Sequence, residues 1–200
     1  MQSELPMAYR RVEYLESNGA QYFWTDVPVQ DGLTVESVQT FAQNNDSYLF
    51  GGAANSYNDR SNFNGFYKQS LQGAYPRSYY DVRTSLAYNT FYHIKTTHED
   101  GIVTAYVDGD LFFSQERSGT VPETGATCAC FGARASDGNI LGIPNLYKGK
   151  VYSIKVSKHN TMLANYIPCV RKSDSKPGMY DIVSKTFYTN AGTGEFIVPA

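Results

Sequence analysis

The sequence has little cysteine and no long apolar run. It contains 3 Cys in 200 residues, a small and odd number that does not make a disulfide framework. Cys128 and Cys130 are two positions apart, which places both side chains on one face of a strand. We therefore expect free, buried thiols that act as small apolar groups. No apolar run approaches the ~20 residues that cross a bilayer, so no membrane-spanning helix is predicted.

Neither sign of charge is in excess. The chain carries 17 Lys+Arg against 19 Asp+Glu, a formal net charge of -2. This balance predicts no general attraction to nucleic acid or to an anionic membrane. The first residues, MQSELPMAYR, lack the apolar segment of a secretory signal. We expect synthesis without self-encoded export, so that delivery to a surface requires another route, such as assembly into a larger particle.

Tyrosine and glycine are abundant instead. The chain has 17 Tyr, 11 Phe and 17 Gly but 1 Trp, a composition typical of half-buried strands and frequent turns. Apolar residues do not recur at helical spacing, whereas short apolar runs alternate with turn residues every ~8 to 12 positions. The pattern predicts an all-β, two-sheet antiparallel jelly-roll sandwich. Its size suits one domain, with residues 1–8 as an N-terminal arm and 9–200 as the sandwich.

The clearest local signals are turn dipeptides. Asn18-Gly19 separates two apolar-rich runs and predicts a hairpin. A two-residue loop at 108–109 predicts a second hairpin, with Val107 opposite Asp110 and Ala105 opposite Phe112. Both faces of this second hairpin carry apolar residues, so the pattern does not tell which face is inward.

Other strands are predicted from composition. Short strands are expected near 63–69 and 77–84, within a polar and aromatic middle segment. Pro168 lacks a ladder donor and is expected to end a strand that begins at Met162. Charged residues beyond it are expected to pair across a corner: Arg171, Lys172, Asp174 and Asp181.

Catalytic patterns are missing from the sequence. Glucanases of sandwich architecture carry closely spaced carboxylates on one strand face, and no such spacing is present. Asp108 and Asp110 are two positions apart but straddle a predicted turn. The three histidines, His93, His98 and His159, have neither zinc-ligand spacing nor a nucleophile elbow. We therefore predict no catalytic residue and no enzymatic activity.

The middle segment contains the candidate binding residues. Aromatic faces stack on sugar rings, while Asn, Asp and Arg side chains bond their hydroxyls. Protein interfaces use the same residue types, and tyrosines also pack within sheets, so all three interpretations stay open. The candidates are Asn55, Tyr57, Asp59, Asn62, Asn64, Tyr67, Tyr75, Arg77, Tyr79 and Tyr80.

No metal site or other cofactor is assigned. Calcium is kept as an alternative because sandwiches hold it with loop oxygens. Neither of the two oxygen-rich loops has the twelve-residue EF-hand pattern, and Asn and Asp are also ordinary turn residues. The loops contain Asn55, Asn58, Asp59 and Asn62, and Asp137 and Asn139.

The order of several motifs resembles a known family. VEYLESNGAQYFWTDV (12–27) stands near the N-terminus and YIPCVRKSDSKPGMYDIVSKTFYTNAGTGEF (166–196) near the C-terminus. LFGG, AYVDGDLFF and GKVYSIKV lie between them. Together, over about residues 8–197, they resemble laminin-G-like, concanavalin-A-like modules of tailed phages of gut bacteria and of bacterial surface proteins. The resemblance implies a non-enzymatic jelly roll and assigns no site residues.

The resemblance implies a role at a surface. Our first hypothesis is a virion-surface module of a phage, in a head decoration, head fibre or tail fibre, that contacts host-surface glycans. Its expected partners are virion proteins or further copies of itself, as a homo-oligomer such as a trimer. The alternatives are a carbohydrate-binding adhesion module of a gut bacterium, located outside the cell, and a glycan-active hydrolase.

Overall fold

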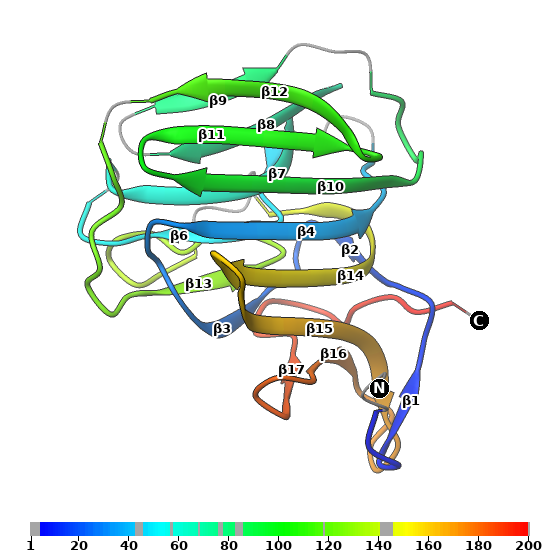
Figure 1. Ribbon diagram of the computed structural model, residues 1–200. Coiled ribbons are helices and arrows are strands. Elements are labelled where there is room, and N and C mark those ends of the chain that lie inside the picture. The colour runs from blue at the N-terminus through cyan, green and yellow to red at the C-terminus, as the bar shows by residue number, and fades with distance from the viewer. Residues whose placement is uncertain are drawn as a thin grey trace.

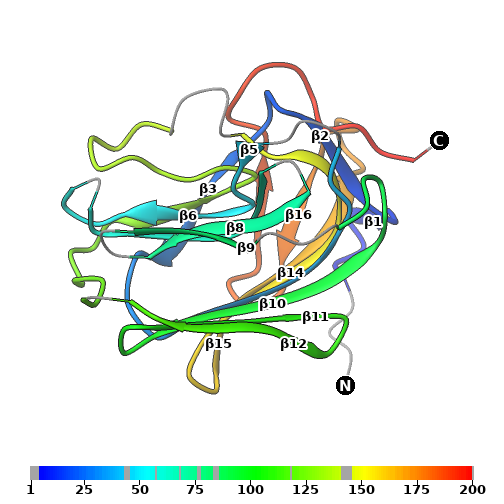
Figure 2. The same ribbon diagram turned by 90° about the horizontal axis from the view of Figure 1, so that it is seen from above.

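Two antiparallel sheets pack face to face in the computed structural model, as Figures 1 and 2 show from two directions. The structure describes residues 5–42, 46–56, 58–67, 69–75, 78–82, 86–117, 119–140 and 146–199. All regular elements in these ranges are strands. Accordingly, no helix in this part of the chain has the length and apolarity needed to cross a membrane.

The larger sheet has ten strands and faces the viewer in Figure 1. Its main path follows the order β12-β11-β10-β4-β14-β15-β16-β17, while β1 pairs with β15 and β2 with β14. Their bounds are β1 Tyr9–Arg11, β2 Leu15–Asn18, β4 Leu33–Gln39, β10 Tyr92–Glu99, β11 Ile102–Val107, β12 Asp110–Glu116, β14 Lys148–Lys158, β15 Thr161–Arg171, β16 Pro177–Asp181 and β17 Thr186–Thr189.

The smaller sheet has seven strands and lies behind the larger one in Figure 1. Its order is β3-β13-β6-β7-β8-β9, and β5 pairs with β7. The bounds are β3 Phe23–Pro28, β5 Asp46–Ser47, β6 Phe50–Ala53, β7 Arg60–Tyr67, β8 Ser70–Tyr75, β9 Ser78–Val82 and β13 Thr127–Cys130. The predicted all-β, two-sheet sandwich is confirmed.

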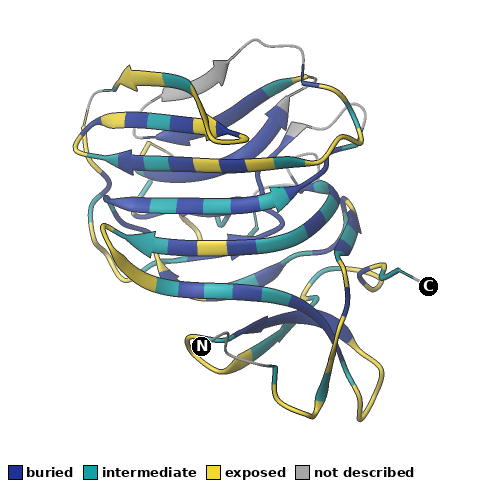
Figure 3. Cartoon of the chain, turned by 45° about the vertical axis from the view of Figure 1, so that its right-hand side comes forward, coloured by how far each residue is buried: buried dark blue, intermediate teal, exposed yellow. Residues whose placement is uncertain are grey.

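Strands of the larger sheet alternate between buried and solvent-facing residues, as the banding in Figure 3 shows. In β4, Leu33 and Val35 are fully buried, while Thr34 and Glu36 between them are partly exposed. Period-two alternation of this kind presents one face of the sheet to the core and the other to water. The larger sheet therefore has a polar outer face that the described part of the chain leaves open to solvent.

Aromatic stacking and buried thiols fill the space between the sheets. The rings of Phe41 and Phe66 stack with their centroids 3.7 Å apart. Cys128, Cys130 and Cys169 are free and buried, as the sequence predicted. Burial raises the pKa of Cys169 to about 12, so this thiol stays protonated and is a poor nucleophile.

Buried hydrogen bonds also join the two sheets. Asn64 on β7 donates from Nδ2 to the Ser37 hydroxyl (2.9 Å) and to the Val35 carbonyl (3.2 Å) on β4. Gln39 in turn donates to the Asn64 carbonyl (3.2 Å). Asn64 has φ 50 and lies where the β7–β8 register shifts. This bulge aims the amide across the interior, because a left-handed residue breaks the ladder locally.

Asn64→Ala is expected to lower the free energy of unfolding by about 1–3 kcal/mol because buried partners on β4 lose their donor, and by a further ~1 kcal/mol because alanine disfavours the left-handed φ of 50 at this position. Chemical denaturation measures this change. The exposed Asn55 supplies a matched control, because Asn55→Ala removes the same group from the surface and is expected to change stability by less than about 0.5 kcal/mol. Equal losses for the two variants would contradict the bridging role of Asn64.

The hairpin predicted at Asn18-Gly19 is wrong. β2 pairs with β14 in the larger sheet, whereas β3 pairs with β13 in the smaller one. The dipeptide is instead a crossover between sheets, with Gly19 at φ 94. Gln21 fixes this crossover, since its Oε1 accepts hydrogen bonds from the Ser17 hydroxyl and the Asn18 amide, both 3.0 Å.

The predicted register of the second hairpin is correct only near its turn. Val107 pairs with Asp110, as expected, but Ala105 pairs with Phe113 and not with Phe112. The register shifts between Ala105 and Tyr106, because a bulge adds one unpaired residue, Phe112, to β12. Because a one-residue shift reverses the face of each side chain, the bulge changes which residues of β12 face outward.

Two other strand predictions also need correction. The polar middle contains three strands, β7, β8 and β9, where two were expected. β15 also continues through Pro168 to Arg171. Pro168 lies where β15 leaves β14 and meets β1: the β14 ladder ends at Tyr166 and the β1 ladder begins at Cys169. At this gap the missing N–H of proline is tolerated.

The charged corner after β15 is partly as predicted. Arg171 and Asp174 form an ion pair with Nη2 and Oδ2 2.6 Å apart. Asp181, however, pairs with no lysine or arginine in the described chain. Its carboxylate accepts hydrogen bonds from the amides of Asn165 (2.8 Å), Val183 (3.0 Å) and Ser184 (3.2 Å). Asp181 therefore fixes the β16–β17 turn.

Candidate functional site

The sequence-predicted sugar-binding residues whose side chains are described occupy both exposed and buried positions. Asn55 is exposed, while Asn62 is fully buried on β7. Asp59 closes a tight turn, accepting a hydrogen bond from the Ser56 hydroxyl (3.0 Å). Of the other predicted residues, Tyr57 and Arg77 lie outside the described residues, and only the strand positions of Tyr67, Tyr79 and Tyr80 are described.

Tyr75 is part of the interior. Its side chain is fully buried; its hydroxyl donates to the Asp31 carboxylate and accepts from the Gly101 amide (3.1 Å). Burial and the hydrogen bond to Asp31 raise the pKa of Tyr75. Tyr75 therefore joins β8 to the β10–β11 turn. The buried positions of Tyr75, Asn62 and Asn64 do not fit the exposed sugar contact that the sequence predicted, whereas the role of the other candidates stays a prediction.

The two oxygen-rich loops form ordinary turn hydrogen bonds. Asp137 accepts from the backbone and side-chain amides of Asn139 (2.9 and 3.1 Å), and these bonds lower its pKa. Asn62, expected in the other loop, lies on β7. Within the described ranges, no group of three or more His, Cys, Asp or Glu side chains could hold a metal ion. Calcium stays an untested alternative.

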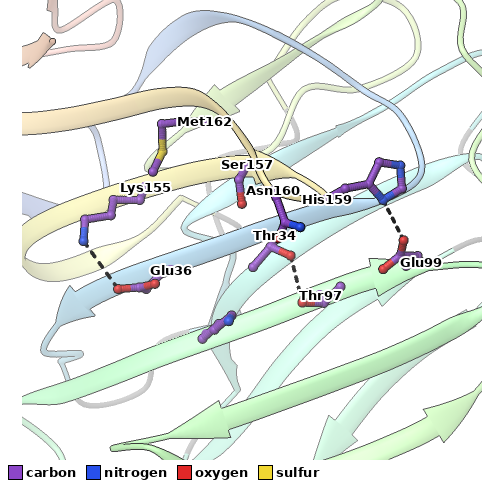
Figure 4. Close-up of a pocket in the computed structure, with 10 residues that line it drawn as sticks. Thr34, Glu36, Thr97, Glu99, Lys155, Ser157, His159, Asn160 and Met162 are labelled. Carbon is purple, nitrogen blue, oxygen red and sulfur yellow. Dashed lines mark hydrogen bonds and ion pairs between the residues drawn. The ribbon is translucent and has the colours of Figure 1, made fainter. Parts of the chain in front are cut away.

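A large groove lies on the outer face of the larger sheet. It has a volume of about 530 Å³, within the usual size range of ligand sites. Residues of β4, β10, β14 and β15 and of the β14–β15 turn form it, and Figure 4 shows their side chains projecting from the sheet. The lining residues are Thr34, Glu36, Lys95, Thr97, Glu99, Lys155, Ser157, His159, Asn160 and Met162.

Strand register arranges these side chains in rows. Thr34 pairs with Thr97 on one side and with Ser157 on the other, which places three hydroxyl side chains side by side across the sheet. The Thr34 and Thr97 hydroxyls are 2.9 Å apart. Two residues along, Glu36 pairs with Lys95 and with Lys155. A hydroxyl row thus lies beside a charged row, about 7 Å away.

Ion pairs hold the charged side chains of the groove. Glu36 Oε1 lies 3.0 Å from His93 Nε2 and 3.7 Å from Lys155 Nζ. At the other end, Glu99 Oε1 lies 2.7 Å from Nδ1 of His159, which reaches over from the β14–β15 turn (Figure 4). All five side chains are between 33% and 61% exposed, so solvent and ligands can reach them.

A smaller hollow continues from the groove. It has a volume of about 210 Å³ and is lined by His93, Lys95, Tyr106 and Gly109. Lys95 belongs to both hollows. The groove and the smaller hollow together follow β10 from Glu99 to His93, which is six residue steps or a length of ~20 Å. The site therefore suits an elongated ligand better than a single small ring.

The two carboxylates of the groove belong to residues that lie far apart along the sheet. Glu36 pairs with Lys95, and Glu99 lies four residues further along β10, a backbone separation of ~13 Å. Glycoside hydrolases place their two carboxyl groups ~5 to 9.5 Å apart. Glu36 and Glu99 are instead each bound to separate basic partners. What the groove offers is a set of fixed hydrogen-bond donors and acceptors.

Sequence reasoning missed this groove although a signal was present. Segments 33–39, 92–99 and 148–158 carry polar side chains at most alternate positions. That pattern marks a solvated sheet face, but it does not show which strands become neighbours. The histidines also differ in role: His93 and His159 are exposed beside the groove, whereas His98 is fully buried.

Comparisons with known proteins identify the fold but no family. No protein-family model matches the sequence, and no curated protein matches it.

Several solved structures share the architecture at low sequence identity. A Bacteroides ovatus protein named for carbohydrate binding has a TM-score of 0.64 at 16% identity, over 96% of this chain and 60% of that one. Mouse laminin α1 domains LG4-5 have a TM-score of 0.57 at 16% identity, over 86% of this chain and 51% of that one. The CBM40 of a Ruminococcus gnavus sialidase has a TM-score of 0.54 at 10% identity, over 74% of this chain and 91% of that one. This chain thus spans little more than half of the first two structures, and its fold is a laminin-G-like, concanavalin-A-like jelly-roll sandwich.

Proposed function

We propose that the protein is a non-catalytic glycan-binding module whose outer-face groove holds an oligosaccharide. The observation that carries this proposal is the groove itself: about 530 Å³ of open space over rows of hydroxyl, carboxylate and ammonium groups. Sugars carry many hydroxyl groups that both donate and accept. Threonine and serine hydroxyls have the same dual capacity, and carboxylates and lysines add strong acceptors and donors.

Proteins of this fold support the proposal. The Ruminococcus gnavus CBM40 was solved with α2,3 sialyllactose, and domain 4 of a Geobacillus stearothermophilus arabinanase, with a TM-score of 0.53 at 16% identity, was solved with arabinotriose. Because fold alone does not fix function, these structures show that the architecture can hold glycans. For this chain, the proposed function rests on its own polar groove.

Thr97→Val is expected to weaken oligosaccharide binding about 5- to 10-fold, which corresponds to one net hydrogen bond. The change removes a hydroxyl from the centre of the groove at nearly constant volume. A glycan-array screen of the purified chain identifies the ligand, and calorimetry then measures both affinities. Thr186→Val, on the exposed start of β17 away from the groove, is the control. Binding to no glycan, or equal affinity of the two variants, would reject the groove as the site.

We further propose that the module is displayed on a phage virion, in a head decoration or a fibre, as a homo-oligomer in contact with other virion proteins. The motif order over residues 12–27 and 166–196 supports this setting. Adhesion at a bacterial surface is the alternative. Antibody labelling of intact particles in the electron microscope should mark the virion surface. Labelling of bacterial envelopes alone would favour the alternative, and light scattering of the purified chain measures the copy number.

A further inference from the structure

We propose that the groove prefers acidic glycans, with a carboxylate or sulfate group of the sugar bound at Lys95. This inference rests on the proposed glycan-binding function and specifies its ligand class. It follows from the distribution of charge along the groove, from the position of Tyr106, and from the acidic residue at the opposite end.

Positive charge exceeds negative charge around Glu36, because Lys95 and Lys155 flank this one carboxylate on the two neighbouring strands. Lys155 and His93 both contact its Oε1 atom, at 3.7 and 3.0 Å. Lys95 lies directly opposite Glu36 in the ladder, yet among the ion pairs of the described residues none includes Lys95. The Glu36 carboxylate thus contacts two basic side chains. The Lys95 ammonium is exposed on β10 and is available to pair with an anionic group of a ligand.

Lys95 also occupies the junction of the two hollows. An anion bound there can belong to a sugar in the middle of an elongated chain, because space continues in both directions along β10. A single lysine attracts carboxylate and sulfate alike as a point charge. The structure therefore selects for an acidic group, and experiment must tell which kind is preferred.

Tyr106 supplies an aromatic surface beside this charge. It pairs with Lys95 across β10 and β11, is 37% exposed and lines the smaller hollow. Neighbouring strands lie ~4.8 Å apart, so one sugar ring can contact the Tyr106 ring while its acidic substituent reaches Lys95. Aromatic contact and charge pairing then act on the same sugar.

The opposite end of the groove disfavours an anion. Glu99 is 41% exposed and has one ion-pair partner, His159, which is charged only when protonated. Glu99 lies ~13 Å along β10 from Lys95. An acidic sugar is therefore attracted at Lys95 and repelled at Glu99. The bound glycan should place its acidic residue near Tyr106 and its neutral residues over Thr97 and Ser157.

Matched oligosaccharides test this preference. Calorimetry at pH 7 should compare a uronate-containing trisaccharide, its methyl ester, and a sulfated analogue. We expect at least one acidic form to bind about 5-fold or more tighter than the ester, and the advantage to shrink in 0.5 M salt because exposed charges are screened. Lys95→Gln should reduce the ratio of acidic to ester affinity to about 1, while Lys172→Gln, on the exposed turn after β15, should leave that ratio unchanged.

The outcomes separate the two proposals. Equal affinity of the wild-type chain for acidic and ester forms, or a Lys95→Gln variant that keeps the preference, overturns the acidic-ligand inference while glycan binding stands. Binding of none of the three sugars and of no array glycan overturns the proposed function as well. A Tyr106→Ala variant should weaken both forms together, which distinguishes ring stacking from charge pairing.

Discussion

Replacing Gly51 with alanine is expected to lower the free energy of unfolding by more than about 4 kcal/mol, a loss that few single substitutions reach. Gly51 lies in the middle of the smaller sheet, where β6 pairs with β13 and β7. Its φ of 150 belongs to a region that only glycine adopts readily. A Cβ at this position would lie 2.4 Å from the Ser61 carbonyl oxygen and 2.6 Å from Asn62 Cα. Both are backbone atoms of the neighbouring strand, so no side-chain rotation relieves the clash.

Gly125→Ala separates backbone strain from the clash. Gly125 has φ 82, and a Cβ there would meet nothing within 4 Å. This control is expected to cost about 1–2 kcal/mol, the penalty of a left-handed alanine. Chemical denaturation of both variants gives the comparison, with circular dichroism showing whether Gly51→Ala folds at all. Similar costs at the two sites would mean that the β6–β7 pair shifts apart without penalty.

Much of the fold could be predicted from local signals. The period-two alternation in 33–39 is typical of a strand such as β4, and the turn at 108–109 predicts the β11–β12 pair near its loop. These features depend on neighbours in sequence, whose geometry the pleat and the turn type determine.

Features that depend on distant residues could not be predicted. Asn18-Gly19 favours a tight turn, but whether that turn continues one sheet or crosses to the other depends on β14 and β13, more than 100 positions away. The groove has the same origin. Its lining extends from Thr34 to Met162, and only the strand order brings these residues together.

Tyrosine is an ambiguous sequence signal for a binding site, for a physical reason. A tyrosine can be buried if its hydroxyl finds a partner, as Tyr75 does with Asp31 and Tyr147 does with the Thr40 carbonyl (2.6 Å). Composition does not reveal such partners. Interior and surface tyrosines therefore look alike in sequence, and Tyr106, the tyrosine that lines the smaller hollow, was not among the candidates.

Acidification from pH 7 to pH 5 is expected to lower the free energy of unfolding by about 2 kcal/mol through His98 alone. The imidazole is fully buried on β10, stacked on Phe63 with centroids 3.9 Å apart. Its Nδ1 lies 2.7 Å from the Ser61 hydroxyl oxygen. Burial lowers the pKa of His98 well below its usual value of 6.5, because the charged ring would lose its hydration.

The direction of the effect follows from proton binding. Below pH ~6.5 the unfolded chain protonates this histidine while the folded chain does not, so stability falls by up to ~1.4 kcal/mol per pH unit as acid is added. Above pH ~6.5 both states are neutral and the contribution is constant. Asp174 affects stability at lower pH. Arg171 lowers its pKa to about 2, so the contribution of Asp174 to the free energy of unfolding is lost only as the pH falls below ~4.

Denaturation curves at intervals between pH 5 and 8 measure the slope. His98→Gln should reduce the slope of the free energy of unfolding against pH. This holds even if the variant is less stable at pH 7, because the slope does not depend on the stability at one pH. The double variant His93→Gln with His159→Gln removes two exposed histidines and should keep the slope. A wild-type slope near zero would show that the folded protein admits a charged ring at this position.

This buried histidine also affects the groove, because both belong to the same strand. In β10, His98 faces the core, while Lys95, Thr97 and Glu99 face the outer groove. Opening of the interior around a protonated His98 would displace the strand that carries the groove's central side chains. Glycan affinity should therefore fall only in acid strong enough to protonate His98 in the folded chain, whereas at pH 5 stability alone decreases. In His98→Gln this loss of glycan affinity in acid should be absent.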